Sequence, residues 1–352
     1  MSDSGIGGGM SQAESRLIRD GGMEASDADR RQPGRGKTVL VTGAGGFIGR
    51  SMVDVLLSRG FSVRAMVRRP GEGVAGFPAG VEVVQGDITA RSSLSRIADG
   101  VSHIVHLAGP RPDTRMRASA LAALIEYGAR NVLVEAEAAG VRRFVCLSYI
   151  GADERSKSAF YRAQAGAEAL VRGSKCEGFV FRASAAFGPG DRFVDAIIRR
   201  AVAPSPVVLV EGYGDTPYQP IYVGDLCECL AAPLLDDSMA PSERPLELGG
   251  EDVVTPLRIL DESLRCAGRF KLKAHFPLFL MRLTAIASEV FSETPLVRRD
   301  RALDLLTDHT CQASNCAPKL LGRKPACIHD FIRRRVAEMS GAKEMPDLVR
   351  PA

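Results

Sequence analysis

The sequence predicts an α/β protein built on a doubly wound parallel sheet. Strand-like apolar runs alternate with helical segments from residue 37 to residue 182, at the spacing of βαβ units. The first of these runs is apolar throughout, as strands buried on both faces of a parallel sheet are. A glycine-rich turn then joins this strand to the first helix, at the edge where such sheets bind ligands.

Each expected element follows from its local pattern. Residues 38–41 form the first strand, and apolar residues recur at helical spacing over 47–56 before Ser58-Arg59-Gly60 ends the helix. The strands expected next are 63–67, 81–84, 103–107, 144–147 and 178–181, and the helices are 91–98, 121–139 and about 160–171.

The turn at residues 42–49 reads Thr-Gly-Ala-Gly-Gly-Phe-Ile-Gly, and it lies between a strand and a helix. Gly43, Gly46 and Gly49 have the spacing that allows a tight turn, close approach of a pyrophosphate and close helix packing. The helix N-terminus adds N–H groups and a positive dipole end. A plain glycine turn is the alternative, but the context predicts a Rossmann-like fold that binds a dinucleotide. The other turn residues expected at the nucleotide are Gly45, Phe47 and Ile48.

The end of the second strand bears on which dinucleotide is bound. A carboxylate there usually binds the ribose 2′-hydroxyl of NAD, but this chain has Val67 followed by Arg68 and Arg69. Two guanidinium groups can hold a 2′-phosphate. We therefore expect NADP(H), with NAD as the alternative, unless both arginines simply lie on a solvated loop.

Beyond residue 182 the pattern loosens into proline- and glycine-punctuated segments with helices at 226–235 and 256–266. We expect this half to pack on the carboxyl edge of the sheet. The expected organisation is a disordered leader at 1–36, a Rossmann domain at 37–182, a smaller C-terminal α/β region for a substrate or partner at 183–340, and a tail at 341–352.

Composition narrows the class of protein. The chain has 352 residues, 45% of them hydrophobic and 25% charged, with a net charge of +4, which excludes a collagen, an acidic disordered chain and a polytopic membrane protein. Its eight cysteines are scattered without a CxxC pair, which indicates reduced thiols and no metal site. Basic residues are spread along the chain, so no nucleic-acid partner is expected.

Several motifs resemble those of the extended and atypical short-chain dehydrogenase/reductases, which include NAD-dependent epimerases and dehydratases. These motifs are the turn at 42–49, Gly-Asp-Ile at 86–88, His-Leu-Ala-Gly at 106–109, Gly-Pro-Gly-Asp-Arg-Phe at 188–193 and the run at 218–226. The last two look most like the branch that contains the NAD(P)-binding accessory subunit of respiratory complex I. The resemblance implies that Asp87 and Ile88 border the adenine, and that Ala108 and Gly109 pass beneath the ribose and pyrophosphate. A loop cap at Asp87 and a turn glycine at Gly109 are the alternatives.

The catalytic helix departs from the family pattern. Active members use a Tyr-x-x-x-Lys pair, in which the lysine lowers the phenol pKa and binds the nicotinamide ribose. Aligning Glu168 with the family glutamate puts Phe160 at the tyrosine position and Gln164 at the lysine position. A shift by one residue makes Tyr161 the tyrosine but leaves Ala165 at the lysine position. Glutamine can bond a ribose hydroxyl but supplies no cation.

The preceding strand end offers Ser148 and Tyr149 as groups that could orient a carbonyl, although a backbone-bonded serine and a packed tyrosine are the simpler roles. We therefore expect a protein that holds NADP(H) in a structural, assembly or sensing role linked to a respiratory or membrane-associated complex. The alternative is an NADP-dependent oxidoreductase, epimerase or dehydratase acting on a nucleotide sugar, sterol-like or quinone-like substrate, with Tyr161 or Tyr149 as its acid.

An apolar stretch at 275–291 is shorter than a bilayer span and contains Arg282. A lid helix packed on the C-terminal region is one reading. The other is a helix that docks on a protein partner or a membrane surface, which would make the protein cytoplasmic and peripheral to the inner face of a membrane.

Overall fold

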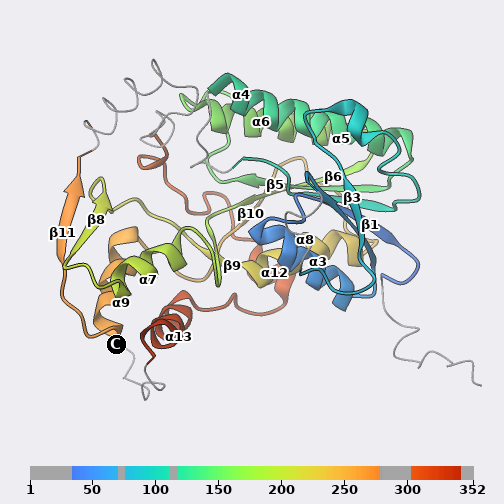
Figure 1. Cartoon of the computed structure of the whole chain (residues 1–352). Helices are drawn as coiled ribbons and strands as arrows, with labels where there is room; N and C mark the ends of the chain where they lie inside the picture. The colour runs from blue at the N-terminus through green and yellow to red at the C-terminus, as the bar shows by residue number, and fades with distance from the viewer. Residues whose placement is uncertain (1–33, 70–75, 111–117, 278, 280–302, 342–352) are drawn as a thin grey trace, which may run out of the picture.

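The computed structural model describes residues 34–69, 76–110, 118–277, 279 and 303–341. Its centre is a seven-stranded sheet in the order β10-β6-β5-β4-β1-β2-β3, with every neighbouring pair parallel (Figure 1). The strands are β1 (Thr38–Thr42), β2 (Ser62–Val67), β3 (Glu82–Gln85), β4 (His103–His106), β5 (Arg143–Tyr149), β6 (Glu177–Ala183) and β10 (Leu246–Leu248). The predicted α/β fold class is confirmed. The strand order reverses between β1 and β4, which opens a ligand crevice at their carboxyl ends.

Helices cover both faces of the sheet because the strands are apolar on both sides. Val39 and Val41 of β1 belong to the core beneath α3 and α8, whereas Leu40 belongs to the core beneath α5 and α6. The helices on the first face are α3 (Phe47–Ser58), α8 (Val223–Leu235) and α12 (Ala317–Leu321). Those on the second are α4 (Ala118–Ala122), α5 (Gly128–Ala138) and α6 (Ala159–Arg172). The helix expected at 121–139 is interrupted by a π-helical turn at Ala123–Tyr127.

The helix predicted at 91–98 is wrong. Only a short 3₁₀ helix, η1 (Arg91–Leu94), forms there. The Ser93 hydroxyl bonds the carbonyl oxygen of Ala90 at 2.7 Å and accepts a bond from the Asp87 N–H at 2.9 Å. Serine side chains that bond nearby backbone groups in this way compete with α-helix formation.

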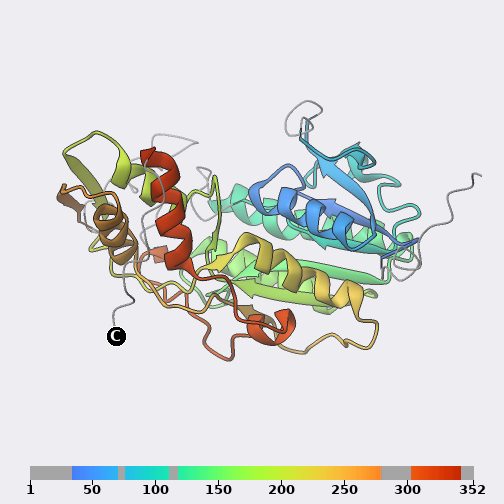
Figure 2. The same ribbon diagram turned by 90° about the horizontal axis from the view of Figure 1, so that it is seen from below.

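The chain beyond residue 182 contributes to both halves of the molecule. Strand β10 pairs with β6, and α8 packs against α3, so residues 37–182 alone do not complete the sheet. The remaining segments lie beside the sheet (Figure 2), and all of them except β11 contribute residues to a separate apolar cluster. They are β7 (Ala186–Phe187), α7 (Val194–Val202), β8 (Val207–Glu211), β9 (Ile221–Tyr222), α9 (Pro256–Cys266), β11 (Leu272–Phe276) and α13 (Ile328–Ser340).

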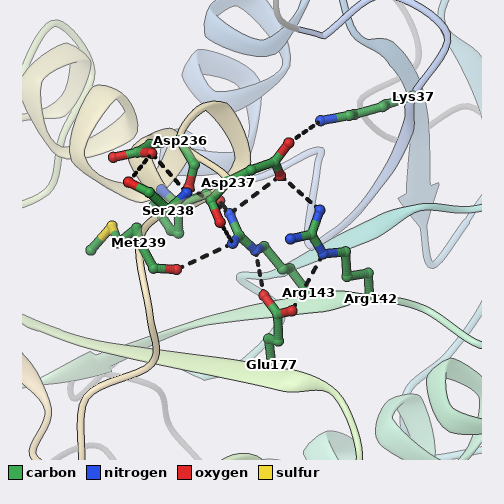
Figure 3. Close-up of polar contacts among 9 residues, drawn as sticks. Lys37, Arg142, Arg143, Glu177, Asp236, Asp237, Ser238 and Met239 are labelled. Carbon is green, nitrogen blue, oxygen red and sulfur yellow. Dashed lines mark hydrogen bonds and ion pairs between the residues drawn. The ribbon is translucent and has the colours of Figure 1, made fainter.

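Arg143 fixes α8 to the sheet. Its side chain is 1% exposed, and its Nε donates to Glu177 at 2.7 Å, across the start of β5 and β6. The other guanidinium nitrogens donate to main-chain oxygens at the end of α8 and just after it, those of Pro233, Asp236, Asp237 and Met239 (Figure 3). A cation that caps carbonyls at a helix C-terminus is favourable, so this contact holds the C-terminal half in place.

Several expected segments lie outside the described residues. These are the leader up to residue 33, the tail from residue 342, and positions 278 and 280–291 of the apolar stretch. Within the described residues, no helix has both the length and the apolar character that crossing a bilayer requires.

Candidate functional site

The glycine turn has the geometry of a phosphate-binding loop. Gly43 has φ of +70°, and a Cβ there would lie 2.8 Å from the Ala108 nitrogen. A Cβ at Gly49 would lie 2.2 Å from the Gly43 oxygen, so only glycine lets α3 pack this closely on the turn. Gly46 caps α3 without a side-chain hydrogen bond, and the first turn contains no acidic residue. The N–H groups of this turn are therefore available to an anion.

Thr42 and His106 hold the facing loop in place. The Thr42 hydroxyl oxygen lies 2.9 Å from His106 Nδ1 and accepts bonds from the Leu107 and Ala108 N–H groups, both at 3.2 Å. Burial lowers the pKa of His106 to about 4, so the ring is neutral at pH 7. Since the Thr42 oxygen already accepts two bonds, its proton points to Nδ1, and the imidazole carries its own proton on Nε2.

Two cavities open beside the turn. The larger, about 690 Å³, extends from the α3 N-terminus towards the C-terminal region, and the smaller, about 50 Å³, lies against Ala108 and Gly109. Ile48, Leu147 and Tyr149 line both. Other predicted residues on the larger cavity are Gly45, Gly46, Phe47, Ser148 and Tyr161. The larger cavity has the size of a small-molecule site.

Phe160 and Gln164 have different surroundings. Phe160 is 1% exposed and packs edge-on between the rings of Tyr149 and Tyr161, at centroid distances of 5.1 and 5.2 Å. Gln164 is 6% exposed and lines the smaller cavity. Its side-chain amide has no hydrogen bond to any residue in the described part of the chain. The amide can donate and accept hydrogen bonds, so this group fits a site that receives a polar ligand.

Tyr161 joins a cluster that the sequence did not indicate. Its hydroxyl donates to Asp304 at 2.6 Å, and Asp304 in turn lies 3.5 Å from Nε2 of His309. The His309 ring stacks on Tyr218 at a centroid distance of 4.3 Å. All four residues are buried, and all four line the larger cavity. Burial, together with the Asp304 carboxylate, raises the pKa of Tyr161 far above its usual value, so the phenol stays protonated.

Ser148 and Tyr149 are placed differently from each other. The Ser148 hydroxyl donates to Glu168 at 2.5 Å, a bond to a side chain and not to the backbone. Arg182 binds both oxygens of the same carboxylate, at 2.8 and 2.7 Å. This network already occupies the Ser148 proton. Tyr149 is half-buried and presents its ring to both cavities.

Ala108 and Gly109 line the smaller cavity, but the residues expected at the adenine and the 2′-phosphate line neither cavity. Arg68 and Arg69 are exposed just beyond β2. One oxygen of Asp87 accepts bonds from the hydroxyl and N–H of Thr89, which lower the pKa of this carboxyl. Ile88 is buried against Gly128. Asp87 therefore has at least the loop-capping role.

Sequence reasoning missed several residues of the site. Arg50 follows Gly49 directly and lines the larger cavity, a position that the turn motif could have indicated. The sequence contained no signal for Asp304 and His309. Both lie more than 140 positions after Tyr161, so no local motif links them to it. Arg192 and Arg200 also line the cavity. Within the described residues, no cluster of histidine, cysteine or acidic side chains could hold a metal ion.

Comparison with known proteins agrees with this geometry. The family model described as NAD(P)H-binding matches residues 43–181. The ceramide reductase of Caulobacter vibrioides is 34% identical over 175 residues, which cover 49% of this chain and 53% of that protein. Subunit 9 of the mitochondrial NADH dehydrogenase [ubiquinone] 1 alpha subcomplex of Arabidopsis thaliana is 28% identical over 253 residues, covering 69% and 61%. The chain thus spans less than two thirds of the length of these relatives.

Solved structures share the fold. A UDP-glucose 4-epimerase from Thermotoga maritima, with UDP-glucose, has a TM-score of 0.67 at 18% identity, covering 86% of this chain and 99% of that one. A UDP-glucose 4-epimerase from Thermus thermophilus, in complex with NAD, has a TM-score of 0.64 at 20% identity, covering 87% and 100%. At these identities the likeness concerns the architecture alone.

Proposed function

Since the chain belongs to the atypical short-chain dehydrogenase/reductase-like family and carries its NAD(P)H-binding domain, we propose that it is a nicotinamide-dependent oxidoreductase acting on an apolar, lipid-like substrate. The observation that carries this proposal is the cavity of about 690 Å³ beside the phosphate turn. The turn residues Gly45 and Gly46, at one end of this cavity, would face the cofactor, whereas the part lined by Ile197, Val208 and Leu260 lies beyond the turn and offers space for a substrate. The sequence alone favours a protein that holds NADP(H) in a structural role. The cavity leads us to favour an enzyme instead.

The lining of the cavity supports an apolar substrate with a polar end. Its walls away from the turn are mostly apolar. Arg50, Arg192 and Arg200 supply cations, and Asp191, Glu211 and Asp304 supply carboxyl groups. The apolar residues of these walls include Phe193, Ile197, Val208, Val210, Leu226, Leu260 and Leu305. A nucleotide sugar would leave most of this apolar surface unused. The similarity to a ceramide reductase points in the same direction.

The cofactor we propose is NADP(H). The phosphate turn receives the pyrophosphate, and Arg68 and Arg69 lie at the strand end where a 2′-phosphate would be held. Gln164 lies at the smaller cavity with an unpartnered amide, which suits the hydroxyl groups of the nicotinamide ribose. Ala108 and Gly109 line the same cavity.

Tyr161 is the acid that we propose, supported by Asp304 and His309. A bound reduced nicotinamide supplies a hydride to the carbonyl carbon of the substrate, whose oxygen must then gain a proton. The Tyr161 hydroxyl, which Asp304 holds in place at the cavity wall, would give this proton to the substrate oxygen, and a proton from solvent in the cavity would then restore the phenol. The product is an alcohol.

Turnover with a defined probe tests this proposal. Oxidation of NADPH is followed with a long-chain 3-keto amide and with a 3-ketosteroid, each presented in detergent micelles. We expect turnover that Tyr161→Phe reduces by roughly 10²-fold or more, the usual contribution of a general acid. Tyr149→Phe tests the other candidate phenol, and the exposed Tyr213→Phe is the matched control. The proposal is overturned if neither probe is reduced by a protein that binds NADPH, or if neither Tyr161→Phe nor Tyr149→Phe lowers the rate.

A structural, assembly or sensing role is the second candidate. Phe160 and Gln164 at the family tyrosine and lysine positions favour it, as does the similarity to a complex I subunit. Its partner would be a respiratory or membrane-associated complex, with the protein in the cytoplasm at the inner face of a membrane. In that case NADP(H) raises the melting temperature, and a partner is retained only with nucleotide, while no substrate is turned over.

A further inference from the structure

Two adjacent strands present an apolar surface at the end of the molecule opposite α5 (Figure 1). Its exposed side chains are Val207 and Leu209 of β8, Leu272 of β11 and Phe270 just before β11, which we call the β8–β11 edge. Phe270 is 94% exposed and Leu272 is 66% exposed. We propose that the β8–β11 edge docks the protein on the surface of an anionic phospholipid bilayer.

The sheet register puts these side chains on one side. Val208 and Val210 are buried in the apolar cluster with α7 and α9, so the alternating Val207 and Leu209 point away from it. Leu272 is the register partner of Val207 in the parallel pair and therefore points the same way. Val207, Leu209 and Leu272 therefore form an apolar outward face on β8 and β11.

The two neighbours of Phe270 fix its position through hydrogen bonds to the end of α7. The Arg269 guanidinium donates to the main-chain oxygens of Val202 and Ala203, at the end of α7. The Lys271 ammonium donates to the oxygens of Arg200 and Ala203. Phe270 therefore projects from a firmly held turn beside the exposed Arg269, whereas Lys271 is 5% exposed and keeps its ammonium inside the protein. In the described part of the chain, neither Arg269 nor Lys271 forms an ion pair with a carboxylate.

An anionic lipid surface matches both features. Aromatic side chains insert at the level of the headgroups, and nearby cations are attracted to anionic lipid. A second copy of the chain matches poorly, because a twofold contact through this edge would bring the exposed Arg269 against its own counterpart. Docking does not depend on nucleotide binding. Leu209 also lines the larger cavity, so a docked protein would present that cavity to the bilayer, a consequence that rests on the proposed function.

Vesicle flotation of the full chain tests the proposal. We expect binding to vesicles of phosphatidylcholine mixed with phosphatidylglycerol, weaker binding to phosphatidylcholine alone, and loss of binding at high salt. Phe270→Ser should weaken binding roughly tenfold, and Arg269→Gln roughly fivefold on the anionic vesicles only. Tyr127→Ser and Arg130→Gln are the matched controls, because both residues are exposed and lie at or beside α5.

Three results would overturn the proposal. The first is a wild-type protein that does not bind anionic vesicles. The second is a Phe270→Ser, Leu272→Ser double variant that binds them as tightly as the wild type. The third is sedimentation showing that the wild type self-associates through this edge and that Phe270→Ser abolishes the association. NADPH affinity is measured for every variant, so that a failure of docking is distinguished from a failure of nucleotide binding.

Discussion

The hydroxyl of Tyr161 donates a 2.6 Å hydrogen bond to the carboxylate of Asp304, 143 positions further along the chain. The bond joins α6 to the segment that carries His309, inside the wall of the larger cavity. Through this bond Tyr161 belongs to a buried acid–base cluster, although it lies one residue after Phe160, which stands at the tyrosine position of the family.

Breaking the Tyr161–Asp304 contact should cost stability. Tyr161→Phe removes one hydrogen-bond donor from the buried Asp304 carboxylate, which is expected to lower the free energy of unfolding by about 1–3 kcal/mol. Asp304→Asn should cost a similar amount. Urea unfolding of both single variants and the double variant gives their coupling energy, which we expect to reach about 1 kcal/mol. Strictly additive effects would mean that the bond contributes nothing.

Gln164→Leu should lower the affinity for NADPH without lowering the stability of the protein. The amide has no partner among the described residues, so its removal should leave the melting temperature of the nucleotide-free protein unchanged or slightly higher. NADPH affinity should fall by about 2- to 13-fold, the value of one lost hydrogen bond. Gln312→Leu, at an exposed glutamine, is the control. A variant that is destabilised but binds NADPH normally would show that Gln164 only packs.

Replacing Arg68 and Arg69 by alanine should change cofactor preference. Loss of the charge-assisted bonds to a 2′-phosphate is expected to weaken NADPH binding by roughly 10-fold or more and to leave NADH binding unchanged. Titration of both nucleotides measures the ratio. Arg59→Ala, at an exposed arginine after α3, is the matched control. Equal effects on the two nucleotides would remove the basis for preferring NADP(H).

Stability should fall as the pH is lowered from 6.5 towards 4. Burial lowers the pKa of both His103 and His106 to about 4. In this interval the unfolded chain binds protons that the folded chain does not, and each histidine costs up to about 3 kcal/mol by pH 4. His329 acts in the opposite sense, because its bond to Glu262 raises its pKa.

A single substitution isolates the His103 contribution. Both ring nitrogens of His103 are buried without a hydrogen bond. His103→Leu should therefore stabilise the protein at pH 5 and reduce the slope of stability against pH, as measured by urea unfolding at several pH values. His275→Leu, at an exposed histidine, is the control. An unchanged slope would mean that His103 titrates normally in the folded protein.

The sheet was predictable because its strands are short, apolar and regularly spaced. The predicted strands at 38–41 and 144–147 lie within β1 and β5, and the helix at 256–266 has the predicted bounds. Strand β10 was not predicted, because three residues carry no periodic signal and only pairing with β6 makes them a strand. The helix at 91–98 failed because serine side chains bonded to the backbone outweighed its apolar spacing.

The candidate site also has a part that the sequence could predict and a part that it could not. A local sequence motif specifies the phosphate turn, so Gly43, Gly46 and Gly49 could be identified from their spacing alone. The cluster of Asp304 and His309 around Tyr161 exists only because the chain returns to α6 after more than 140 residues. Tertiary contacts of this kind leave no pattern in one sequence.

Titration of the purified chain with NADPH, followed by nucleotide fluorescence, tests the central claim most directly. We predict saturable binding of one nucleotide per chain and at least roughly tenfold weaker binding by Gly46→Ala, whose methyl group would face the pyrophosphate. The backbone of Gly46 is in an extended conformation open to alanine, but the new Cβ would lie 3.2 Å from the Gly43 oxygen, which must shift by a few tenths of an ångström, so the melting temperature of the variant is measured alongside. Gly173→Ala, with its Cβ 3.4 Å from the nearest atom, should bind normally. A folded wild-type protein that binds neither NADPH nor NADH, or a Gly46→Ala variant that binds as tightly as the wild type, would contradict the account.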